Sequence, residues 1–130
     1  MPEPRRIVPE SGVRPGLNSS GSTIAKHRIV VQGAAVDQIA QAAAATAPYY
    51  GVTMEAIANG VTGDVQVAGK ATVEAGAALA KNVNVMSDAS GRAILATATN
   101  NVLGRTVANA ATAAGQIIEV ELCDQPQVAP

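Results

Sequence analysis

The sequence predicts a small all-β protein, and three features of the chain lead to this prediction. Short apolar segments recur from residue 28 to residue 122 and are broken by glycine at close intervals. Several of them alternate apolar and polar side chains, as strands with one buried face do. Pairs that favour tight turns, such as Asn59-Gly60, lie between them. About seven strands in this arrangement are typical of a compact barrel or sandwich.

The first 22 residues are expected to form an extended N-terminal arm in front of this body. Four prolines lie in the segment, and each removes a backbone donor and restricts the residue before it, which disfavours helix and central strand. Ile7 and Val8 follow Arg5 and Arg6 and make a short apolar segment that suits contact with another subunit. A disordered leader is the alternative interpretation of the same composition.

The β body is expected over residues 23–124, followed by a C-terminal tail at 125–130. Ser87–Gly91 offers an aspartate that can accept backbone hydrogen bonds and a glycine for a left-handed position. Asn59-Gly60 suits positive φ at both central positions of a hairpin turn. The candidate strands are Arg28–Gln32, Tyr50–Ile57, Asp64–Val73, Asn82–Met86, Arg92–Thr97, Val102–Val107 and Gln116–Leu122.

One segment, Val36–Ala47, fits a helix and a strand equally well. It has the highest helix propensity in the chain, and Val36, Ile39 and Ala43 would share one helical face. As a strand it would place Val36 and Ile39 on opposite faces, with alanines filling the rest. The all-β prediction therefore leaves room for one short helix here.

The chain also contains an internal repeat. Gly51–Met54, followed by Thr62–Val67, resembles Gly104–Val107, followed by Ala114–Ile118, and the two copies lie 53 residues apart. Each copy has the pattern strand, small-residue loop, glycine, strand. Two copies predict a repeated hairpin, because a solenoid needs at least three.

The core is expected to consist of small side chains. Apolar residues make up 48% of the chain, but 27 residues are alanine, Phe and Trp are absent, and Val, Ile and Leu together number 29. At about 25 cal/mol per Å² of buried apolar area, against roughly 1.5 kcal/mol per ordered residue, the free energy of folding a lone monomer is near zero. We therefore expect an oligomer or a large partner surface.

Charge divides the chain into a basic beginning and an acidic remainder. Residues 1–28 carry five basic and two acidic side chains, a net of +3, and residues 29–130 carry four basic and eight acidic ones, a net of −4. The total of −1 indicates neither nucleic-acid binding nor the role of an acidic tail. With no apolar run long enough to span a membrane, no signal peptide and a single cysteine, we expect a soluble protein made in the cytoplasm.

No set of residues in the sequence points to catalysis, a cofactor or a metal. Gly63–Ala71 has five residues between its glycines and no hydroxyl for Mg²⁺, unlike a phosphate-binding loop. His27 lies between two basic residues, which disfavours a cation there, and Cys123 lacks a second histidine that could act as its base. Lys70 and Lys81 lack the flanking residues of the lysine that biotin- or lipoate-carrying β domains present. We therefore predict that the protein is not an enzyme.

Several turn and strand patterns, spread over about residues 15–122, are similar to those of tailed-phage capsid cement or decoration proteins. They carry no chemical signature. The segments that carry the similarity are Pro15–Leu17, Ile24–Val30, Gly51–Thr53, Gly63–Gly69, Ala75-Gly76, Ser87–Ala93, Leu103-Gly104 and Gly115–Leu122.

This resemblance implies a β-tulip fold and a homotrimer on the outer surface of an icosahedral phage head, where it would stabilise the shell by clamping neighbouring capsomers. The partner would be the major capsid protein, reached by the N-terminal arm after synthesis in the host cytoplasm. Carried onto this sequence, the contacts would fall to Arg5, Arg6, Ile7, Val8 and Arg14. No cofactor, direct nucleic-acid binding or membrane binding is implied. A small β-barrel carrier or ligand-binding domain is one alternative, and an adhesin or fibre module is another.

Overall fold

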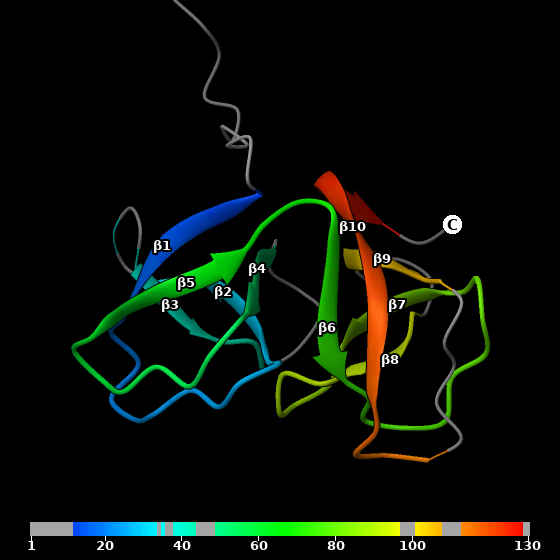
Figure 1. Ribbon diagram of the computed structural model, residues 1–130, viewed down its shortest axis with the longest axis horizontal. Helices are drawn as coiled ribbons and strands as arrows, with labels where there is room; N and C mark the ends of the chain where they lie inside the picture. Colours follow the sequence, from blue (N-terminus) through cyan, green and yellow to red (C-terminus); the bar gives the residue numbers. More distant parts are fainter. Residues whose placement is uncertain are drawn as a thin grey trace, which may run out of the picture.

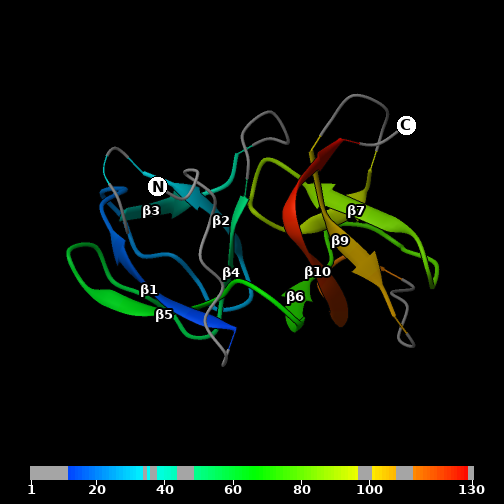
Figure 2. The same ribbon diagram turned by 90° about the horizontal axis from the view of Figure 1, so that it is seen from above.

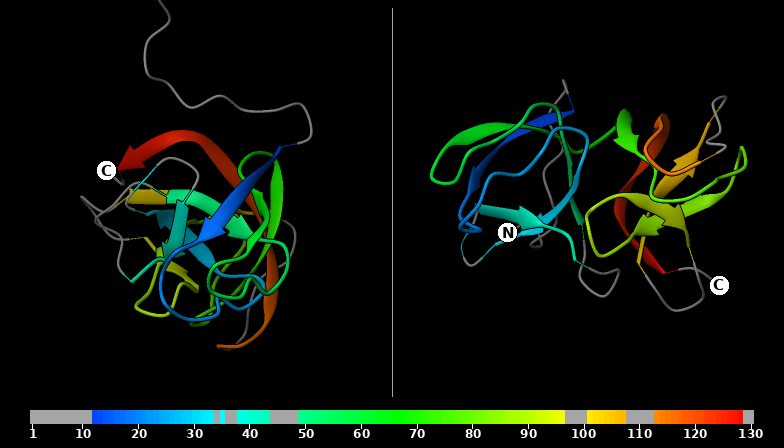
Figure 3. Two further views of the ribbon diagram at one scale, coloured as in Figure 1. Left: turned by 90° about the vertical axis from the view of Figure 1, so that its left-hand side faces the viewer. Right: turned by 90° about the horizontal axis from the view of Figure 1, so that it is seen from below.

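The part of the chain that the structure describes forms ten strands, arranged in two lobes (Figure 1). The computed structural model describes residues 12–33, 35, 38–43, 49–96, 101–107 and 113–128, and no helix occurs among them. The predicted all-β class is therefore confirmed. The strands are β1 (Val13–Asn18), β2 (Ile29–Gln32), β3 (Gln38–Gln41), β4 (Tyr49–Thr53), β5 (Thr62–Gln66), β6 (Lys70–Glu74), β7 (Asn84–Ser87), β8 (Ala93–Leu95), β9 (Asn101–Thr106) and β10 (Ile117–Val128). Figure 2 and the right-hand view of Figure 3 show the first lobe, β1–β5, beside the second lobe, β6–β10.

The first lobe is a closed barrel with the strand order β1-β3-β2-β4-β5. The first strand closes it by pairing antiparallel with β5 and parallel with β3, where Leu17 lies opposite Gln38. Alternation along the strands sends every second side chain inward. The resulting core consists of residues that are at most 6% exposed, namely Ile24, Val30, Ile39, Tyr50, Ile57, Val65 and Val67.

The second lobe has the same neighbour relations, in a five-stranded sheet ordered β6-β10-β9-β7-β8. In this order β6 takes the place of β1, β7 of β2, β8 of β3, β9 of β4 and β10 of β5. A single parallel bridge between Ala75 and Ala93 stands where the first barrel has its parallel β1–β3 pairing. The second lobe is therefore a version of the same barrel that is almost open at one edge.

The strand registers and the special backbone positions of the two lobes also match. Thr53 lies opposite Val65, as Thr106 lies opposite Val120. Positive φ angles occur at corresponding residues, for example at Gly60 and Gly115 with 83° and 94°. The predicted repeated hairpin is confirmed as β4–β5 and β9–β10, and it belongs to a larger repeat that covers all five strands.

Each of the seven candidate strand segments overlaps a strand, and one of them overlaps two. Asp64–Val73 is divided between β5 and β6, because Gly69 has a φ of 78° and turns the chain between them. Val36–Ala47 contributes β3, with residues 36, 37 and 44–47 outside the described part. Pairing of β3 with β2 and with β1 satisfies its backbone groups, and this tertiary contribution outweighs the helix propensity of the alanines.

The described part of the expected arm, residues 12–22, belongs to the first lobe. Residues 13–18 are β1, and Pro15 fits there because β3 pairs with β1 only from Leu17 on, so the ladder needs no N–H from the proline. Residues 1–11 and 129–130 lie outside the described residues. An arm therefore stays a prediction for residues 1–11.

The two predicted turns are present, with one difference. Asp88 Oδ1 accepts hydrogen bonds from two backbone amides of its turn at 2.8 and 2.9 Å, and Gly91 has a φ of 73°, as predicted. At Asn59-Gly60, however, only Gly60 has positive φ. This is the pattern of a type II turn, and the prediction of positive φ at both positions is wrong.

Side chains of the first lobe cover the open edge of the second lobe between β6 and β8. Ile29 and Val52 point out of their own barrel and belong to the hydrophobic cluster that fills the second lobe. The backbone also spans the gap, because Glu74 N donates to His27 O at 3.0 Å and Ile29 N donates to Gly91 O at 2.7 Å. The hydrophobic cluster of the second lobe therefore contains residues of both lobes, and the first lobe completes the second.

Candidate functional site

The predicted contact residues fall into two groups, of which the structure describes one. Arg5, Arg6, Ile7 and Val8 lie outside the described residues. Arg14 lies on β1 and is half-buried, with its guanidinium carbon 5.4 Å from the centre of the Tyr50 ring. This distance is within the range of a cation–π contact.

The place where residues 1–11 join the body is well defined. The carbonyl oxygen of Gly12 accepts hydrogen bonds from Val67 N at 2.7 Å and from Ala68 N at 3.3 Å. Gly12 has a φ of 73°, and a Cβ there would lie 2.8 Å from the Ala68 carbonyl oxygen. The first eleven residues are therefore attached beside the connection between β5 and β6, where the chain passes from one lobe to the other (Figure 1).

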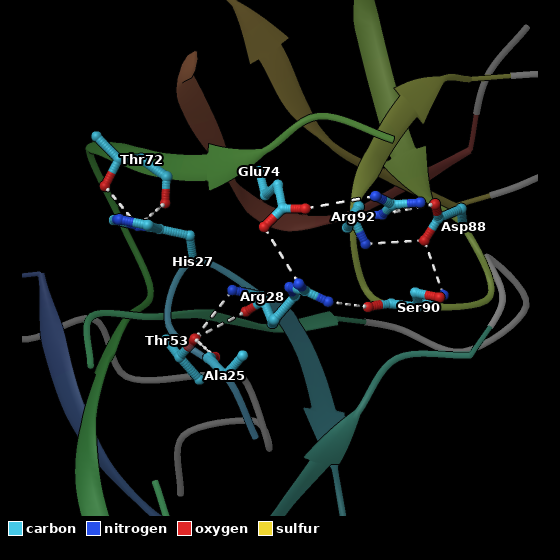
Figure 4. A network of polar contacts seen from close by, with 9 residues as sticks. All are labelled: Ala25, His27, Arg28, Thr53, Thr72, Glu74, Asp88, Ser90 and Arg92. Carbon is cyan, nitrogen blue, oxygen red and sulfur yellow. Dashed lines mark hydrogen bonds and ion pairs between the residues drawn. The ribbon is translucent and has the colours of Figure 1, made fainter. Parts of the chain in front are cut away.

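A polar network crosses the junction of the lobes, with Glu74 at its centre (Figure 4). One carboxylate oxygen of Glu74 lies 3.1 Å from Arg28 of the first lobe, and the other lies 3.4 Å from Arg92 of the second. Arg28 also donates to the Ser90 carbonyl at 3.1 Å, and Arg92 lies 3.5 Å from the Asp88 carboxylate. These side chains are about one-fifth to one-third exposed, so the network holds the lobes together, with modest free energy per pair.

His27 belongs to the same junction and is held by a neighbouring strand. Its Nδ1 lies 3.2 Å from the carbonyl oxygen and 3.1 Å from the hydroxyl of Thr72. Among the described residues, no group of three or more His, Cys, Asp and Glu side chains could hold a metal ion. The role of His27 in this structure is thus a contact between lobes.

Tyr49 makes a further link between the lobes. Its hydroxyl oxygen accepts a hydrogen bond from the Ser87 amide at 3.0 Å. Burial of the side chain raises the pKa of Tyr49 above its ordinary value of 10.0, and the hydrogen bond from Ser87 opposes that change to a smaller extent. The phenol is therefore neutral at physiological pH and acts as a structural acceptor.

Two exposed turns have the same construction in the two lobes. In the first lobe the hydroxyl of Thr53 donates to Ala25 O at 2.8 Å and accepts from Arg28 N at 2.9 Å. Each turn contains a residue with positive φ directly after a lysine. In the second lobe the hydroxyl of Thr106 donates to Ala80 O at 2.8 Å and accepts from Val83 N at 3.0 Å, and the positive φ angles are 64° at His27 and 61° at Asn82.

The lysines of these turns, Lys26 and Lys81, are exposed on a firmly held backbone. Both threonines are at most 1% exposed, so their hydroxyls fix the turns from inside the barrel. This pair of turns is not among the features predicted from the sequence. The signal was present in the similar segments Ile24–Lys26 and Leu79–Lys81.

Replacing either threonine by valine tests how the turns are held. Thr53→Val and Thr106→Val should each lower the free energy of unfolding by about 1 kcal/mol, because valine keeps the shape but leaves a partly buried amide and carbonyl without the hydroxyl as partner. The two losses should add, since the sites lie in separate lobes. Urea unfolding followed by circular dichroism measures this, with the exposed Thr62→Val as control, and equal stability of all three variants would contradict it.

No helix among the described residues is long and apolar enough to span a membrane.

A family model described as "phage cement protein" matches residues 17–122. A solved structure, the N base of the head fiber gp8.5 of bacteriophage phi29, superposes with a TM-score of 0.66 at 19% identity, covering 88% of this chain and 96% of that one. At this identity the superposition demonstrates a shared fold. No curated protein sequence matches significantly.

Proposed function

This chain belongs to the phage cement protein family, and from that premise we propose that it binds the outer surface of an icosahedral phage head as a homotrimer and clamps neighbouring capsomers. The family supports a structural, capsid-stabilising role. The observation that carries the proposal is the extent of the family match, which spans strands of both lobes. The major capsid protein is the proposed partner, met by a chain made in the host cytoplasm.

The proposed attachment uses the N-terminal arm, now limited to residues 1–11. An extended segment can add its backbone donors and acceptors to the edge of a sheet in the capsid protein, with alternate side chains giving the register. Three arms on one trimer would bind as a linked set, which can raise the overall affinity by roughly 10² to 10⁴. Attachment of the arm at Gly12 supports this proposal, because this buried glycine is hydrogen-bonded to the segment that connects the two lobes.

Charge supports the choice of contact residues. Arg5 and Arg6 belong to the basic beginning of the chain, and they would meet acidic groups of the shell, with Ile7 and Val8 supplying apolar contact. Arg14, at the base of the arm, completes the proposed set. Complementary charge at such a contact accelerates association and fixes orientation.

The proposal is tested by binding to heads of the phage that encodes the chain. Reversing Arg5 and Arg6 to glutamate should lower head occupancy in co-sedimentation at least tenfold, because it replaces attraction by repulsion in every arm of the trimer. The matched control reverses Lys70 and Arg105, two exposed residues of the second lobe, and changes the net charge equally. Removal of residues 2–11 should abolish binding and the added heat resistance of the heads.

Light scattering during size-exclusion chromatography tests the oligomeric state in the same preparations. A mass of three chains is expected. A stable monomer, or heads that are fully occupied by the arm-deleted protein, would overturn the proposed mode of attachment.

A further inference from the structure

The repeat allows the two lobes to be compared residue by residue. Strand register and matching backbone hydrogen bonds align them without reference to residue identity. Most aligned positions differ, for example Ile29 with Asn84 and Val52 with Arg105. Identical pairs include Gly12 and Gly69, Ala25 and Ala80, Lys26 and Lys81, Val30 and Val85, Gly51 and Gly104, Thr53 and Thr106, Gly60 and Gly115, and Val65 and Val120.

The fold itself accounts for most of the identical pairs. Gly60 and Gly115 have positive φ, and a Cβ at Gly51 or Gly104 would overlap a backbone carbonyl of the paired strand. The valines fill the cores, and the threonine hydroxyls hold the two turns. Each of these identities has a reason inside the chain.

The lysine pair lacks such a reason in the part of the chain that the structure describes. Lys26 and Lys81 are both exposed, and neither side chain has a hydrogen bond or ion pair with a described residue. An exposed position of this kind tolerates many types of side chain. An identical charged residue at the same place of two lobes that otherwise differ widely indicates contact with something outside the chain.

The construction of the turns suits such a contact. Each lysine is followed by a residue with positive φ, and the hydroxyl of one buried threonine holds each turn by donating one hydrogen bond to a carbonyl and accepting one from a backbone amide. A backbone held in this way loses little conformational entropy when its side chain is bound. In Figure 1 the β1–β2 connection runs along the lower edge of the first lobe, and the β6–β7 connection leaves the lower end of β6.

We propose that Lys26 and Lys81 are two equivalent contact points, each of which pairs with the same carboxylate on a different copy of one shell subunit. This inference rests on the proposed function, which supplies a partner built from identical subunits. Such a shell presents each of its acidic groups many times in related positions. A protein that carries the same lysine on each of two similar lobes can meet two of them at once, and the two contacts reinforce each other.

The choice of an acidic protein group follows from charge. Residues 29–130 carry a net charge of −4, so an acidic shell would repel most of the body, and exposed lysines at the points of contact would offset that repulsion. Pairs of this kind act mainly on association and orientation, and they weaken as salt screens them.

The test uses the full chain with three single variants and one double variant. Lys26→Glu and Lys81→Glu should each weaken binding to heads by about tenfold, and the double variant by about a hundredfold, because the two contacts are separate. Lys70→Glu is the matched control, since it is an exposed lysine of β6 whose counterpart in the first lobe is Val13. Binding is measured by co-sedimentation at low and high salt, and thermal unfolding should be unchanged in all four variants.

The outcomes separate this inference from the proposed function. A double variant that binds heads as the wild type does, while removal of residues 2–11 abolishes binding, overturns the lysine contacts and leaves the proposed function intact. A loss confined to one lysine, or an equal loss in Lys70→Glu, also overturns the two-point contact. Wild-type protein that binds no heads of its own phage overturns both.

Discussion

Replacing Ile29 by alanine is expected to lower the free energy of unfolding by about 2–5 kcal/mol. The Ile29 side chain is fully buried, and it lies in the hydrophobic cluster of the second lobe although its strand belongs to the first. Alanine would leave a cavity at the open edge between β6 and β8, where only one bridge joins the strands. Both lobes should lose stability together, in a single unfolding transition.

The matched control for this prediction is Asn84→Ala. Asn84 occupies the same position in the second lobe, on β7, but its side chain is exposed. Its replacement should change the free energy of unfolding by no more than about 0.5 kcal/mol. Guanidinium unfolding at fixed protein concentration compares the two variants, and similar midpoints for both would show that Ile29 does not join the lobes.

Gly104→Ala is expected to cause the second large loss, of about 3 kcal/mol, at the upper end of the range for overpacked sites. A Cβ at this position would overlap the carbonyl oxygen of Glu121 and lie 2.8 Å from its carbonyl carbon, both on the paired strand β10. The backbone of β10 cannot rotate away from the added methyl group as a flexible side chain could. Gly51→Ala should have a similar effect, because its Cβ would overlap the carbonyl oxygen of Gln66 on β5.

Gly33→Ala serves as the control for these glycines. The nearest atom to a Cβ at Gly33 is the Ser19 hydroxyl oxygen at 3.0 Å, which belongs to a side chain that can move. The melting temperature of the Gly33→Ala protein should therefore fall much less than that of the Gly104→Ala protein. A Gly104→Ala protein that melts with the Gly33→Ala protein would contradict the close approach of β9 and β10.

The strands with strong local signals were predictable, and those that depend on distant partners were not. β5, β7 and β10 alternate clearly in the sequence, and the aspartate turn at Ser87–Gly91 has the hydrogen bonds expected of it. β1 contains Pro15, and β3 lies in an alanine-rich segment. Those two strands form because they pair with each other, and because β1 also pairs with β5 and β3 with β2. No local sequence pattern indicates these pairings.

The functional features divide in the same way. The sequence pointed to the correct family. The Glu74 network joins residues that are 46 and 18 positions apart, and the equivalence of Lys26 and Lys81 depends on aligning whole lobes. The arm contacts at Arg5, Arg6, Ile7 and Val8 stay predictions.

By itself, the sequence determined that this chain forms β-strands with small side chains and with turns at glycine. It could do so because the alternation of apolar and polar side chains and the preferences of turn residues act over only a few positions. Only the tertiary structure decided that two lobes with the same strand neighbours lie side by side, one a closed barrel and the other almost open at one edge. The Ile29 and Val52 side chains of the first lobe pack inside the second. The corresponding face of the second lobe bears Asn84 and Arg105 and remains in solvent. The strand pattern is the same in both lobes, so it does not decide which of the two faces is buried. The Ile29 and Val52 face is buried because it lies against the open edge between β6 and β8. That edge forms only when strands far apart in the sequence have paired.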